Sequence, residues 1–108
     1  MEYKLKENYS FTTDRFKDIW FIGNNVEIQG NLIIIKAPFE WNGCTGARDN
    51  KKTYYPSCVH DALCTEHNMP ITQKTKDLIF LDLLKKEKFM GAYMYYAGVR
   101  LFGRFFVS

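Results

Sequence analysis

A histidine and two aspartates are the residues of this sequence best suited to acid–base chemistry. His60 and Asp61 are adjacent near the start of a predicted helix, where consecutive side chains point about 100° apart and can therefore serve different partners. Asp77 lies early in the next predicted helix, and antiparallel pairing of the two helices would place it beside His60. A carboxylate there would accept the proton of one imidazole nitrogen. This contact fixes the tautomer and allows the other nitrogen to act as a general base.

Asp61 is predicted to face the opposite way, toward the loop of residues 39–46. The glycines of that loop permit backbone carbonyls to turn inward. Carbonyl oxygens together with one carboxylate are ligands that Ca²⁺ prefers. The sequence therefore predicts an oxygen-rich calcium site between this loop and the helix that carries Asp61.

The same three residues also allow a structural interpretation. His60 and Asp77 would then form a buried polar pair that ties two helices together, and Asp61 would accept hydrogen bonds from backbone amides of the loop. This interpretation requires neither a metal nor a substrate.

Zinc is the alternative to calcium. His60, Cys64 and His67 are spaced as positions i, i+4 and i+7 of one helical face, which suits zinc if Asp77 or Cys58 supplies a fourth ligand. A histidine at a helix end, such as His67, more often contacts the last carbonyls or solvent. The three cysteines of the chain are otherwise expected to be reduced and to act as small packing residues.

The elements that must position these residues follow from hydrophobic patterns and turn signals. Residues 1–40 are β-rich, with a hairpin of residues 25–29 and 32–37 preceded by shorter candidate strands. Residues 39–55 contain glycines and polar side chains that are typical of a loop. A loop of that length in so small a domain is usually functional, so we expect it to form part of the site.

Residues 56–104 are predicted to be mainly helical. Ser57 is the predicted N-cap of the first helix, and the segment around Pro70 ends it. Thr72 is the predicted cap of a second helix, and a third runs from about residue 89 to 102 at helical spacing. The short connection between the first two predicts an antiparallel helix hairpin.

Length and composition indicate one domain over residues 1–108, of the α+β class. It would contain a small N-terminal antiparallel sheet, a long site loop and two or three C-terminal helices. A net charge of +3 without a dense basic stripe gives no clear nucleic-acid signal. No signal peptide is visible, and no apolar run approaches the ~18–20 residues that a membrane-spanning helix requires.

The aromatic C-terminal stretch, residues 89–106, includes Arg100 as one of its cations. Such a segment could dock on a lipid surface. We expect Tyr93, Tyr96 and Phe102 to complete the core instead, because a small domain needs their apolar area.

Four segments resemble, in order, the landmarks of domain-of-unknown-function family 1353, which is found in phages and prophages. They are Phe39–Thr45, His60–Leu63, Asp77–Leu81 and Val99–Gly103. The resemblance covers roughly residues 26–104. The chain departs from the usual family pattern at Asn42, Cys44, Cys64 and Lys76, where the family has aspartate, alanine, tyrosine and alanine. These departures affect an expected activity more than the expected fold.

The order of these features is also similar to that of phospholipases A2: a glycine loop, a histidine–aspartate pair on a helix, and an aspartate on an antiparallel helix. This similarity implies that His60 is the base and Asp77 orients it. It also implies that Asp61 binds calcium together with carbonyl donors, for which the matching positions are Trp41, Gly43 and Thr45.

The function expected from the sequence is therefore a calcium-assisted hydrolase that cleaves an ester or other acyl bond during lysis or penetration of a host cell. Phospholipid or a cell-wall polymer would be its substrate, and the host cytoplasm or the virion its location. The main rival is a non-catalytic binding or virion-assembly protein with phage proteins as partners. Sequestration of a nucleotide signal is a third hypothesis, but no phosphate-cradling motif supports it.

Overall fold

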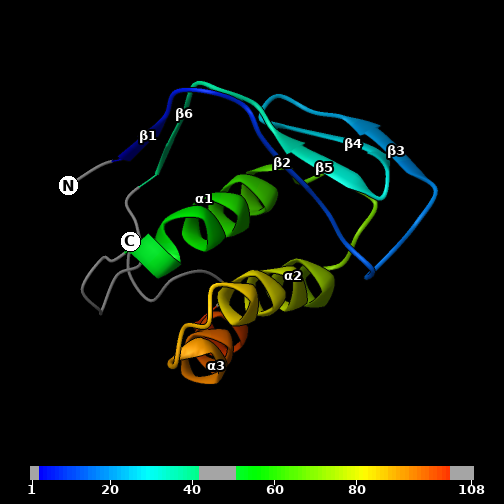
Figure 1. The fold of residues 1–108 in the computed structure, drawn as a ribbon. Coiled ribbons are helices and arrows are strands. Elements are labelled where there is room, and N and C mark those ends of the chain that lie inside the picture. Colours follow the sequence, from blue (N-terminus) through cyan, green and yellow to red (C-terminus); the bar gives the residue numbers. More distant parts are fainter. Residues whose placement is uncertain (1–2, 42–50, 103–108) are drawn as a thin grey trace.

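The computed structural model describes residues 3–41 and 51–102 and has an α+β fold, as predicted. The strands come first in the chain and the helices follow (Figure 1). In Figure 1 the strands lie over one side of the first helix, and the second and third helices follow on its other side.

A four-stranded antiparallel sheet forms most of the β layer. Its strands are β2 (Tyr9–Thr12), β3 (Ile19–Ile22), β4 (Val26–Gly30) and β5 (Leu32–Ile35), in the order β2-β5-β4-β3. The predicted hairpin is β4 and β5, and the shorter candidate strands are also present. Gly30 has a φ of +74° at the hairpin turn, a conformation that glycine adopts without steric cost.

The prediction of a long loop over residues 39–55 is wrong at both ends of that range. Its first residues form β6 (Phe39–Trp41), which pairs antiparallel with β1 (Tyr3–Leu5). Its last residues belong to α1 (Lys51–Thr65). Only residues 42–50 of the predicted loop lie outside both elements, and they are outside the described residues.

Ser57 is not the N-cap of α1, because the helix starts six residues earlier at Lys51 and includes Pro56. Proline removes one backbone donor, but the neighbouring Thr53 and Ser57 are almost fully buried, so tertiary packing maintains the turn around it. The Ser57 hydroxyl accepts a hydrogen bond from Trp41 Nε1 at 2.9 Å and donates one to the Tyr54 carbonyl at 3.0 Å. It therefore joins α1 to β6.

The second and third helices agree better with the sequence. Thr72 caps α2 (Gln73–Lys86), and its hydroxyl accepts a hydrogen bond from the Thr75 amide at 3.1 Å, as expected of an N-cap. Lysines in the last turn of α2 interact favourably with the negative end of the helix dipole. The third helix, α3, spans Ala92–Phe102, three residues shorter than predicted.

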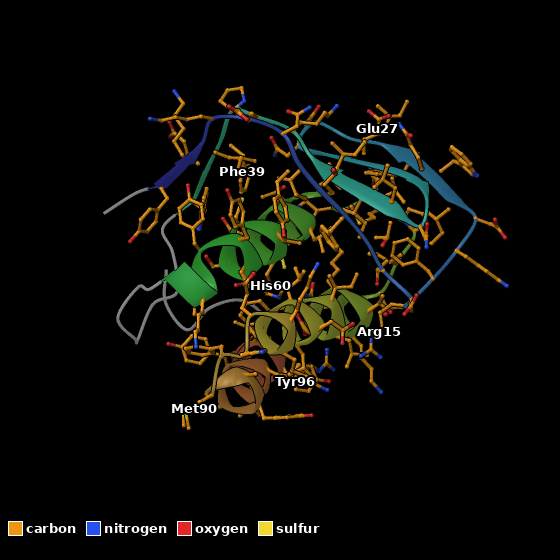
Figure 2. All side chains as sticks on the ribbon, in the orientation of Figure 1. Arg15, Glu27, Phe39, His60, Met90 and Tyr96 are labelled. Atoms are coloured by element: carbon orange, nitrogen blue, oxygen red, sulfur yellow. The ribbon has the colours of Figure 1, made fainter. Side chains whose placement is uncertain are left out.

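The helix α2 is the central element of the core because two of its faces are buried. One face, with Ile79 and Leu83, joins the larger cluster formed by the sheet and α1. The other, with Phe80 and Leu84, packs against α3. Figure 2 shows His60 in the interior, between the α1 and α2 backbones. Polar groups on these inner helix faces are thus shielded from water.

The outer face of α3 differs from the sequence prediction. Tyr93 is 63% exposed and does not complete the core, because α3 packs through Ala92 and Val99, which lie on another face of the helix. Lys85 lies over the Tyr93 ring, with Nζ 5.5 Å from its centroid. Tyr96 does pack against the α2–α3 cluster, whereas the Phe102 side chain is outside the described part. Among the described residues, no helix is long and apolar enough to cross a membrane.

Gly23 provides a test of how the sheet is attached to the helices. Its neighbour Asn25 donates its backbone N–H to Glu66 Oε2 at 2.6 Å, just after the end of α1. A Cβ at Gly23 would collide with the Glu66 carboxylate and the Phe21 ring. We expect Gly23→Ala to lower the free energy of unfolding by about 1–3 kcal/mol, measured by urea denaturation.

The matched control is Gly30→Asn at the β4–β5 turn. Nothing lies within 4 Å of a Cβ there, and asparagine tolerates the left-handed backbone. The control should cost less than about 1 kcal/mol. A Gly23→Ala protein as stable as wild type would show that the Glu66 side chain can move aside without lowering the free energy of unfolding.

Candidate functional site

The predicted contact between His60 and Asp77 is present. Both side chains are 0% exposed, and His60 Nε2 lies 2.7 Å from Asp77 Oδ1. His60 is in the middle of α1, and Asp77 is one turn inside α2. The two helices run in opposite directions in Figure 1, which brings these positions to the same height.

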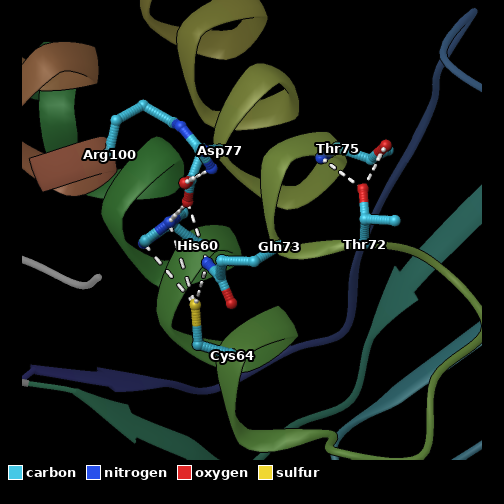
Figure 3. Close-up of polar contacts among 7 residues, drawn as sticks. All are labelled: His60, Cys64, Thr72, Gln73, Thr75, Asp77 and Arg100. Carbon is cyan, nitrogen blue, oxygen red and sulfur yellow. Dashed lines mark hydrogen bonds and ion pairs between the residues drawn. The ribbon is translucent and has the colours of Figure 1, made fainter.

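Asp77 accepts hydrogen bonds from two further side chains (Figure 3). Arg100 Nη1 of α3 lies 2.9 Å from Oδ2, and Gln73 Nε2, one turn earlier on α2, lies 2.9 Å from Oδ1. Side chains of all three helices therefore converge on one buried carboxylate. The Arg100 side chain is 38% exposed and Gln73 is exposed, so the network extends from the interior to the surface.

The protonation of His60 reflects competing effects. Burial lowers the pKa of the imidazole, but the hydrogen bond with Asp77 and the adjacent Cys64 raise it more, to about 9. His60 is therefore an imidazolium at neutral pH, with Nε2–H donating to the carboxylate. Because a buried charge without a partner is costly, Asp77 is what permits His60 to be charged in the interior.

Cys64 lies one helical turn after His60 and is 8% exposed. Its Sγ is 3.8 Å from His60 Nε2 and 4.0 Å from Nδ1, and Gln73 Nε2 lies 3.4 Å from the same sulfur. On the other side, the His60 and Phe80 ring centroids are 4.9 Å apart. The imidazole is thus held between an aromatic ring, a carboxylate and a thiol.

Sequence reasoning missed Gln73 and assigned Arg100 a different role. Arg100 was considered as a cation of a segment that could dock on lipid, whereas its guanidinium contacts Asp77. Gln73 precedes Asp77 by four residues on α2, so the two share one helical face. The i, i+4 spacing from Asp77 is the sequence signal that could have identified Gln73. It points to the site only once Asp77 is known to pair with His60.

The predicted calcium site is only partly within the described residues. Asn42, Gly43 and Thr45 are outside them, so the expectation that Asp61 faces this loop stays a prediction. Asp61 is half-buried, and Trp41 is anchored to α1 by its hydrogen bond to Ser57. Of the predicted calcium ligands, the described residues thus include Asp61 and Trp41.

The zinc spacing does not continue along one helix. The helix α1 ends at Thr65, so His67 lies beyond it, and its side chain is exposed. His60 and Cys64 remain together in the interior. Within residues 3–41 and 51–102, no group of three or more His, Cys, Asp or Glu side chains is arranged to hold a metal ion.

Comparisons of the chain with protein-family models, with curated proteins and with solved structures find no match. The resemblances to the phage family and to phospholipases A2 therefore stay predictions from the sequence. The site itself is an acid–base pair, His60 and Asp77, with a thiol and two hydrogen-bond donors around it.

Proposed function

We propose that the protein is a hydrolase of ester or other acyl bonds, with His60 as its acid–base group and Asp77 as the residue that positions it. The 2.7 Å contact between these two fully buried side chains carries the proposal. As an imidazolium, His60 would give a proton to the leaving group, and once deprotonated it would take a proton from the attacking water. Arg100 and Gln73 would hold the Asp77 carboxylate in the orientation that this transfer requires.

A substrate would approach from the side of Gln73 and Arg100, whose side chains reach the surface. The resemblance to the phage and prophage family supports host phospholipid or a cell-wall polymer as the natural substrate, cleaved during lysis or penetration of the host. Calcium bound by Asp61 and the neighbouring loop would polarise the substrate carbonyl.

A panel of p-nitrophenyl esters, phospholipid vesicles and purified cell wall tests the proposal, each with Ca²⁺ and with a chelator. We expect wild-type turnover on at least one substrate and a loss of about 100-fold or more in His60→Gln, because general acid–base groups contribute that much. His67→Gln is the matched control, since the exposed His67 lies outside the network, and it should retain wild-type rates. Loss of turnover in the chelator would support the calcium contribution.

Absence of wild-type turnover on every substrate would contradict the hydrolase proposal and favour the rival, a binding or virion-assembly protein. One observation supports that rival. The outer side of α3 and the turn before it expose Met90, Tyr93, Met94 and Leu101, which are 63–99% accessible. Exposed apolar side chains gathered in this way are typical of protein-interaction surfaces. In the rival, the His60–Asp77 pair only holds α1 and α2 together.

A further inference from the structure

The thiol of Cys64 has a polar environment that differs from that of an ordinary packing cysteine. Cys64 follows His60 by four residues, so the two side chains share one face of α1. Its sulfur lies near both imidazole nitrogens and accepts a contact from the Gln73 amide at 3.4 Å. A cationic imidazole and an amide donor are the kinds of group that stabilise a thiolate.

The Cys64 sulfur lies almost equally far from the two nitrogens of His60, 3.8 Å from Nε2 and 4.0 Å from Nδ1. Nε2 is bound to Asp77 Oδ1 at 2.7 Å. Asp77 thus orients the ring through Nε2, and the proton exchanged in the reaction would be the one on Nδ1. A nucleophile next to a base that is itself oriented by a third group is the general pattern of covalent acyl transfer. Catalytic contacts are often long without substrate and shorten when it binds.

Cys58 on the same helix shows the opposite environment and is a natural control. It is 0% exposed, and burial together with the Asp61 charge raises the pKa of its thiol to about 12. Cys58 is therefore protonated and inert at ordinary pH. The same helix thus presents one thiol surrounded by apolar groups and another beside a charged acid–base pair.

We propose that Cys64 is the nucleophile of the site and forms a covalent thioester with the acyl group of an ester or thioester substrate. Its catalytic role rests on the hydrolase function proposed above. The ionised state of the thiol can be measured without any substrate.

The reaction would begin from the pair of Cys64 thiolate and His60 imidazolium, with a proton on Nδ1. The thiolate attacks the substrate carbonyl carbon and forms a C–S bond, and the bond from that carbon to the leaving oxygen or sulfur breaks as the leaving group takes the proton from Nδ1. Water then attacks the thioester and gives a proton to Nδ1. The C–S bond breaks, the acid product leaves, and the thiolate–imidazolium pair is restored.

The test is the rate of alkylation of each cysteine in the native wild-type protein by iodoacetamide between pH 6 and 9, followed by peptide mass spectrometry. An ordinary thiol reacts about 100-fold more slowly at pH 6.5 than at pH 8.5, since only its thiolate reacts. We expect the Cys64 rate to change by less than about fivefold over that interval, because the imidazolium maintains the thiolate. Cys58 should stay unmodified throughout.

His60→Gln, checked for folding by circular dichroism, should restore the ordinary 100-fold decline at Cys64. If that variant does not fold, the pH dependence of the Cys64 alkylation rate in the wild-type protein tests the proposal by itself. Failure of Cys64 to react, or a wild-type rate that declines like that of an ordinary thiol, would overturn the proposal. Because no substrate is used, the profile distinguishes failure of this proposal from failure of the hydrolase function.

Discussion

Replacing Asp77 with alanine should lower the free energy of unfolding by about 3–5 kcal/mol, the cost typical of breaking a buried ion pair. The variant would leave His60 in the interior without its carboxylate and remove the group that Arg100 and Gln73 also bind. For a domain of this size, the melting temperature should fall by roughly 12 °C or more. Chemical denaturation and thermal melting followed by circular dichroism measure both quantities.

Asp82→Ala is the matched control, because Asp82 is on the same helix and also pairs with an arginine. Its Oδ1 lies 2.7 Å from Arg15 Nη2, but the two side chains are 40% and 36% exposed. Solvent screens such a pair, so the control should lose no more than about 1 kcal/mol. Equal losses in the two variants would mean that burial of the Asp77 network adds nothing to its strength.

The stability of the wild-type protein should fall between neutral and alkaline pH as His60 loses its proton. The pKa of His60 is raised from an ordinary value of 6.5 to about 9, so the folded state holds this proton more tightly than the unfolded chain. The resulting stabilisation is complete below about pH 6.5 and disappears as the pH rises through about 9. Integrated over that interval, it is on the order of 3 kcal/mol.

Urea denaturation at intervals from pH 6 to 9.5 measures this slope, and the two histidines of the chain allow a direct comparison. His60→Gln should remove most of the decline, and His67→Gln should retain it. The Asp77 carboxylate is bound to His60 Nε2, so Asp77→Asn should also flatten the curve. A wild-type stability that is constant over this range would refute a buried imidazolium.

The sequence predicted the regular elements where local chemistry determines them. The β4–β5 hairpin follows from apolar residues on both sides of Gly30 and Asn31, and α2 follows from the Thr72 cap and its apolar repeat. These signals act over a few neighbouring residues, so they can be recognised without the rest of the chain. Ser57 was predicted wrongly as the N-cap of α1, because its hydroxyl is bound by Trp41, a partner 16 residues away.

The contact of His60 with Asp77 was also predictable, because a short connection forces α1 and α2 into an antiparallel pair. The spacing along each helix then fixes which positions meet. The orientation of Asp61 toward its loop was derived in the same way and still awaits a test.

Residue order along the chain thus determined the fold class, the central hairpin and the histidine–aspartate pair. Only the tertiary structure decided that Arg100 and Gln73 complete the carboxylate network, and that the Gln73 amide also contacts the Cys64 sulfur beside the imidazole. The reason is that the rotation of α3 about its axis is set by packing against Phe80 and Leu84. No local sequence pattern encodes this packing. Nor does a local pattern encode the burial that makes His60 and Asp77 depend on each other.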